Sequence, residues 1–146
     1  MIRQPIYSAI VTQLAALTAP PYSLDIPGPI SEAVQHWSDV QVQPAIFLDV
    51  ETETSVYKYG EPLKWTISAS VWVYAKKQGN TLGVQLLRPI LDGIESVLSP
   101  TQAQEPYLNT LGGLVTRCAI SGKTQINGGF LGDQAVARMA IEIVTA

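Results

Sequence analysis

The sequence predicts an α+β domain: a β-sheet, antiparallel or mixed, with two main helices packed on one of its faces. Two segments carry apolar residues at helical spacing, and four others alternate apolar and polar residues as strands do. These segments follow one another in the order α-β-β-α-β-β, which favours antiparallel pairing of neighbouring strands. At 146 residues the chain suits a single domain, 1–146, with a well-filled core.

The first helix is predicted over residues 4–17. Its apolar stripe recurs at the spacing of one helical face and comprises Ile6, Ile10, Val11, Leu14 and Leu17. Pro5 suits the first turn, where its missing N–H is no loss, and Pro20-Pro21 ends the helix. Residues 18–44 follow as a long irregular segment that is rich in proline. A loop of this length in a small domain often serves a contact.

Two strands are predicted next, over residues 44–52 and 63–75. The second has one apolar face, formed by Trp65, Ile67, Ala69, Val71 and Val73. Its other face is formed by Thr66, Ser68, Ser70, Trp72 and Tyr74. The linker 53–62 is long for a hairpin connection and carries Tyr57 and Tyr59, so it is predicted to project as a loop.

The second helix is predicted to begin at Asn80 or Thr81 and to end before Pro100, with a broad apolar face. Pro89 lies inside it and predicts a kink or a break near Arg88. A C-terminal hairpin follows, with strands over residues 114–121 and 134–145. Between these strands, residues 122–133 hold four glycines, which predict a second flexible, projecting loop.

The composition argues against several classes of protein. With 47% apolar and 14% charged residues the chain is expected to fold, because disorder needs low hydrophobicity and high charge. Neither a membrane span nor a secretion signal is expected, and the single cysteine, Cys118, suits a reducing cytoplasm. The net charge of −3 and scattered basic residues argue against direct nucleic-acid recognition. Sparse charge beside three Trp and six Tyr favours association with other chains.

Two motifs could be mistaken for catalytic or cofactor sites. Residues 121–124, Ser-Gly-Lys-Thr, end like a phosphate-binding loop, but Arg117 stands where that motif needs its first glycine. His36 and Cys118 are too few for a zinc site. As a nucleophilic pair they are disfavoured, because a thiol in the middle of an apolar strand face is usually inert packing. The sequence therefore predicts no catalytic residue, no cofactor and no metal site.

A row of carboxylates is predicted on the first strand, where Asp49, Glu51 and Glu53 alternate and so share one face. Such a row could hold a divalent cation if other oxygens converged on it. More often it is a solvated face or one side of an ion-paired contact, and this interpretation is favoured. Repeated around a ring, the same row would line a channel that repels DNA.

The order of the elements and several short stretches together resemble the tail-terminator, or minor tail, proteins of long-tailed bacteriophages. The stretches are Pro44–Leu48, Val71–Tyr74, Leu86–Glu95, Thr110–Val115 and Gly128–Ala135. The resemblance covers nearly the whole chain as a pattern and the C-terminal third most closely. Pro89 within the second helix departs from the pattern.

The resemblance implies a structural subunit, not an enzyme, that forms a homo-oligomeric ring, with six copies as the expected number. The ring would cap the finished tail tube and face the head–tail connector, with DNA at most passing through and no membrane involved. The subunit would be made in the host cytoplasm and reside in the virion. Candidate contact residues lie in loops expected to be mobile alone and ordered in the ring: Tyr57, Tyr59, Ile126, Phe130 and Leu131. Another neck protein (head-completion or adaptor), a tail-tube subunit and, less favoured, a small enzyme are the alternatives.

Overall fold

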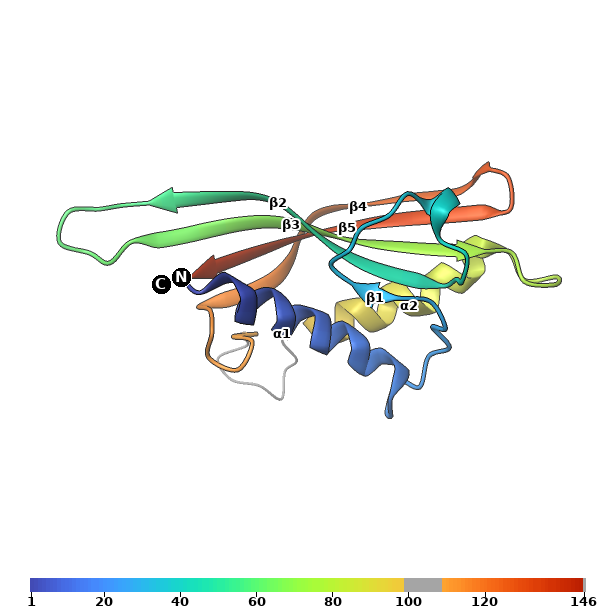
Figure 1. The fold of residues 1–146 in the computed structure, drawn as a ribbon, viewed down its shortest axis with the longest axis horizontal. Coiled ribbons are helices and arrows are strands. Elements are labelled where there is room, and N and C mark those ends of the chain that lie inside the picture. Colours follow the sequence, from blue (N-terminus) through green and yellow to red (C-terminus); the bar gives the residue numbers. More distant parts are fainter. Residues whose placement is uncertain (99–108, 146) are drawn as a thin grey trace.

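A computed structural model describes residues 1–98 and 109–145, without the side chains of residues 129–131. One five-stranded sheet has the strand order β1-β2-β3-β5-β4, and two helices lie on one side of it (Figure 1). The strands are β1 (Ile30–Ser31), β2 (Ala45–Val56), β3 (Lys64–Lys76), β4 (Arg117–Leu131) and β5 (Gln134–Thr145). The helical elements are α1 (Arg3–Ala15), α2 (Gly83–Leu98) and the short 3-10 helices η1 (Ala16–Thr18) and η2 (Trp37–Asp39).

The predicted α+β class is confirmed, but the predicted arrangement is not fully met. A short strand missed by the sequence analysis, β1, pairs in parallel with β2, so the sheet is mixed and the six-element order is incomplete. The other pairings are antiparallel. The helices also differ in their packing: α2 lies across β3, β4 and β5, whereas α1 lies against α2 and β1.

The main core lies between the sheet and the helices. Side chains that alternate along β3 point into it, and Ile67, Val71 and Val73 are fully buried. Helix α1 contributes the predicted stripe, with Val11 at its margin. Burial of this apolar area, at about 25 cal/mol per Å², is the main force that holds the two layers together.

Helix α2 is continuous from Gly83 to Leu98, so the predicted break near Arg88 is wrong, while the alternative of a kink there stays a prediction. Proline removes one backbone hydrogen bond, and here its ring lies on the exposed side of the helix. The opposite side is held by buried Leu87, Ile90 and Ile94. The helix also begins later than predicted, where the Leu82 backbone N–H donates to the Gln85 side chain at 2.9 Å.

The irregular segment 18–44 crosses from α1 to β2 and supplies β1 and η2. Gly28 fixes its path, because its N–H donates to the Pro44 carbonyl at 3.0 Å. A Cβ at this position would lie 2.3 Å from the Val42 carbonyl oxygen, which no side chain tolerates. Only glycine therefore lets the segment approach the start of β2 this closely.

Of the two predicted projecting loops, the first (53–62) is strand up to Val56 and the second (122–133) is mostly strand. Strands β2 and β3 continue to the Val56–Lys64 pair, which leaves residues 57–63 as the connection. Strand β4 runs through residues 122–131 and is wrongly predicted as a loop there; its turn to β5 is only Gly132 and Asp133. The glycines fit because the strand is irregular, with register shifts between Ile120 and Thr124 and between Asn127 and Leu131. Both hairpins still project, at opposite ends of the molecule (Figure 1).

Candidate functional site

The sheet face opposite the helices is the most unusual surface of the molecule. Within the described ranges neither α1 nor α2 covers it, and η2 with its flanking chain packs over Phe47 and Tyr74 at one end. The face carries aromatic and polar side chains together. On β3 these are Ser70, Trp72 and Tyr74, which alternate with the core residues. Their partners on the neighbouring strands include Phe47 and Arg138. We call this surface the open face.

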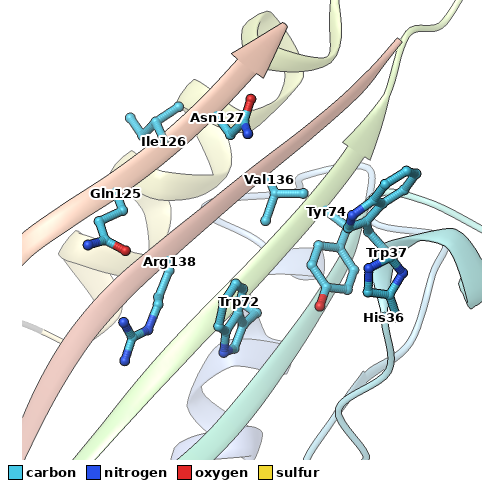
Figure 2. A pocket seen from close by; sticks show the side chains of 9 residues that line it. All are labelled: His36, Trp37, Trp72, Tyr74, Gln125, Ile126, Asn127, Val136 and Arg138. Atoms are coloured by element: carbon cyan, nitrogen blue, oxygen red, sulfur yellow. The ribbon is translucent and has the colours of Figure 1, made fainter. Parts of the chain in front are cut away.

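A hollow of about 440 Å³ lies at one end of the open face. Strands β3, β5 and β4 form its floor, and the segment before and at η2 forms one side (Figure 2). The lining residues are His36, Trp37, Trp72, Tyr74, Gln125, Ile126, Asn127, Val136 and Arg138. A concave site with apolar walls and a few polar groups is the kind that binds a ligand or a side chain.

The aromatic side of the hollow is held rigidly. Tyr74 packs against Phe47 with ring centroids 5.5 Å apart, and its hydroxyl donates to the Gln35 carbonyl at 2.7 Å. The buried Gln43 amide donates to the carbonyls of Trp37 and Val40 at 3.2 and 3.1 Å. The chain around η2 is therefore fixed to the sheet, and the hollow has a preformed shape.

The other side of the hollow is a polar network around Arg138. Its guanidinium lies 5.6 Å from the centre of the Trp72 ring, and its Nε donates to Ser70 Oγ at 2.9 Å. Arg138 also pairs with Glu51, which accepts a hydrogen bond from Ser70 Oγ as well. The Ser70 hydrogen bond and then Arg138 lower the pKa of Glu51, so this carboxylate stays ionised. The Trp72 indole N–H is buried beside this network without a hydrogen-bond partner.

The predicted acidic row does not share one face. Asp49 and Glu51 belong to the open face, but a register shift between Val50 and Thr52 turns Glu53 toward the helices. There it pairs with Arg3, with Nε and Oε2 2.6 Å apart. Among the described residues no group of three or more His, Cys, Asp or Glu side chains could hold a metal ion.

The candidate contact residues divide between the two hairpins. Tyr57 and Tyr59 stand on the β2–β3 connection, 69% and 98% exposed. Ile126 is also exposed, and it lines the hollow at the opposite end of the sheet. The side chains of Phe130 and Leu131 lie outside the described residues. Tyr57 and Tyr59 are thus far from Ile126 within one copy.

His36 and Cys118 are not neighbours in the fold. His36 caps η2, where its Nδ1 lies 2.7 Å from Ser38 Oγ, and its ring lies 5.0 Å from that of Trp37. Cys118 lies in the core, and burial raises the pKa of its thiol to about 12. The phosphate-loop-like residues 121–124 lie within β4, where the strand is irregular.

The sequence analysis missed Trp37, Trp72 and Arg138 as members of one site. A signal was present, because the alternation of β3 placed Trp72 and Tyr74 on the face away from the core. Aromatic residues on a non-core face favour a contact surface. No pattern in the sequence indicated that η2 would form a side of the same hollow.

Among the described residues no helix is long and apolar enough to span a membrane. A scan against protein-family models finds no match. A search of curated proteins finds no significant relative. The open face and its hollow therefore stand as the basis for a functional proposal.

Proposed function

We propose that this chain is a structural subunit of a phage tail, a tail terminator that forms a homo-oligomeric ring. The ring, of six copies by the family resemblance, caps the completed tail tube and joins it to the head-side connector in the virion. DNA passes through without specific binding. The observation that carries this proposal is a sheet that, in the described part of the chain, leaves most of both edges and part of one face uncovered, which suits association better than an isolated domain.

The edges are long. Strand β4 has no strand beside its outer edge in the described part of the chain, over the whole of Arg117–Leu131. At the other edge, β1 pairs only with Ile46 and Phe47, so most of β2 has no outer neighbour among the described residues. Unpaired strand edges attract other strands, and a neighbouring subunit in a ring covers them without leaving an open end.

Large apolar side chains also remain exposed at the two ends of the sheet. Tyr57, Tyr59 and Leu63 stand at one end, and Ile126 stands at the other. With only 14% charged residues, the surface carries little of the charge that keeps a free monomer apart from its neighbours. Both features support assembly.

Two other structural roles use the same surfaces. A head-completion or adaptor protein of the neck also forms contacts with the connector, and it differs in position within the particle. A tail-tube subunit polymerises into long tubes, whereas a terminator stops after one ring. A small enzyme requires a convergent set of reactive groups. In the hollow Arg138 is paired with Glu51, the Tyr74 hydroxyl donates to the Gln35 carbonyl, and His36 Nδ1 lies 2.7 Å from Ser38 Oγ.

The test is the assembly state of the purified subunit, alone and with tail tube. Native mass spectrometry and cryo-EM are expected to show one closed ring, at the end of the tube when tube is present. Long tubes of this chain alone would favour the tail-tube role. A strict monomer under both conditions would overturn the proposal.

A further inference from the structure

We infer that Tyr59 of one copy inserts into the aromatic hollow of the next copy. This inference rests on the proposed function and names the contact through which the subunits associate. It joins two features at opposite ends of the same sheet: an exposed aromatic tip and a preformed hollow. In the part of the chain that the structure describes, no segment fills the hollow and no pocket receives the tip.

The tip comprises residues 57–63, and Tyr59 at its centre is 98% exposed. The turn is closed by a hydrogen bond from the Glu61 N–H to the Lys58 carbonyl at 3.0 Å. Gly60 allows this turn with a φ of +83°. A tyrosine side chain buries 150–250 Å² when covered, so a fully exposed one on an ordered turn is a strong candidate for an anchor.

The hairpin that carries the tip is held against the body of the molecule. Arg3, in the first turn of α1, pairs with Glu53 at 2.6 Å and lies 5.3 Å from the centre of the Trp65 ring. Glu53 and Trp65 belong to the two strands of the hairpin. The tip is therefore presented in a defined direction, which reduces the entropy lost when it binds.

The hollow suits a phenol ring. Trp37 and Trp72 offer aromatic surfaces for stacking. Figure 2 shows Gln125 and Arg138 across the hollow from Trp37, with Arg138 beside Trp72. These two polar side chains can meet the phenolic oxygen. The volume of about 440 Å³ leaves room for the flanking residues of the turn.

The charges of the two features are complementary. The hairpin end carries Lys58 and Lys64 against one acid, Glu61. The open face beside the hollow carries Asp49; the other acid there, Glu51, is already paired with Arg138. Opposite charge on the two surfaces favours the tip-to-hollow orientation over like-to-like contacts.

A tip cannot reach the hollow of its own copy. On β3 the tip end is marked by Lys64 and the hollow end by Tyr74, which pairs with Ala45 at the start of β2. Ten residues of extended strand separate them, or about 33 Å. A contact between two different patches on identical copies can repeat head to tail, which is the geometry a ring requires, whereas a reciprocal exchange of tips would stop at a two-fold dimer.

The experiment places a photo-crosslinking benzoylphenylalanine at position 59 and mixes isotope-labelled with unlabelled chains, with tail tube added where assembly needs it. Mass spectrometry is expected to find mixed-label crosslinks from position 59 to peptides that contain Trp37, Trp72 or Gln125. The same probe at Leu114, an exposed residue away from the tip, is the control and is expected to miss the hollow. Crosslinks from position 59 only to other surfaces, or no intermolecular crosslink, would overturn the inference.

Two substitutions measure the strength of the contact. Tyr59→Ser removes the anchor from a solvent-exposed turn, and Gln125→Trp fills the hollow from an exposed position. Each is expected to weaken association about 30-fold, as loss of a central aromatic anchor does. Leu114→Ser is expected to leave association unchanged. Unchanged association in both test variants would overturn the inference.

The outcome also separates this inference from the terminator proposal. Rings in which position 59 crosslinks elsewhere would retain the proposal and remove the contact. Open filaments with crosslinks into the hollow would retain the contact and remove the terminator role.

Discussion

Glu51 and Glu53 stand two residues apart on β2 and face opposite sides of the sheet. A register shift between Val50 and Thr52 inserts one residue into the strand, so the alternation of sides is reset. Glu51 joins Arg138 of β5 on the open face, and Glu53 joins Arg3 of α1 on the helix side. One irregularity thus ties β2 to β5 across β3 and also holds the projecting hairpin to α1.

Because of the Glu51 contacts, the free energy of unfolding is expected to fall at acid pH. In the unfolded chain this carboxyl titrates near 4.5, and the Ser70 hydrogen bond with the Arg138 pair lowers the pKa in the folded state. A lowered folded pKa gives stability that is present above pH 4.5 and is lost as the pH falls through the folded value. Because the pair is partly exposed, the contribution is about 1 kcal/mol.

Glu51→Gln is therefore expected to lower the free energy of unfolding at pH 7 and to flatten its fall below pH 4.5. Urea unfolding across pH 3–7 measures this. Glu142→Gln, which removes the more exposed ion pair with Arg117, is the control and is expected to have the smaller effect at pH 7. If Glu51→Gln and Glu142→Gln changed the free energy of unfolding equally, the contribution assigned to the Glu51 contacts would be contradicted.

Gly28, the one glycine of segment 18–44, is expected to be harder to replace than Gly60 on the β2–β3 connection. In Gly28→Ala the new Cβ meets the carbonyl oxygens of Val42 and Pro44 at 2.3 and 2.5 Å, so backbone has to shift. Overpacking of this kind costs about 1–3 kcal/mol. Gly60→Ala, which meets nothing within 4 Å but keeps a positive φ, is expected to cost less. Thermal unfolding of both variants measures which one loses more stability. A larger loss in Gly60→Ala would show that the segment around Gly28 adapts to the added Cβ.

The sequence predicted those elements that a regular pattern defines. The boundaries of β5 were predicted to the residue, and the two faces of β3 were assigned correctly, because uninterrupted alternation reports burial directly. Strand β1 was missed because two residues are too short to show any period. Its pairing with β2 depends on the path of the whole segment before it.

Irregular strands were the main source of error. Glycines in residues 122–131 indicated a loop, yet the regular partner β5 aligns this stretch as a strand with two register shifts. A single inserted residue in β2 likewise divided the predicted acidic row. The hollow escaped prediction for a different reason, since its two sides come from η2 and the sheet, which contact only in the folded chain.

Cys118 is expected to be a packing residue without chemical reactivity. Its thiol is buried, and burial raises its pKa to about 12, so thiol reagents at pH 8 are expected to modify it only after unfolding. Cys118→Ala is expected to cost about 1 kcal/mol through lost packing. His36→Ala, at an exposed capping position, is expected to cost no more. A loss of ring assembly in either variant without loss of stability would assign that residue a role in the contact.

The ion pair between Arg3 and Glu53 is expected to set the mobility of the projecting hairpin. Arg3→Ala removes both the pair and the contact with the Trp65 ring, which join α1 to the two strands of the hairpin. Hydrogen exchange in residues 51–56 and 64–68 is expected to accelerate several-fold, because local opening no longer breaks these contacts. Arg117→Ala is a matched control: its ion pair with Glu142 has a similar exposure but lies on β4 and β5, which β3 separates from β2, so exchange in residues 51–56 is expected to stay unchanged. If the two variants accelerate exchange there equally, α1 does not hold the hairpin, and Tyr59 reaches its neighbour from a flexible segment instead.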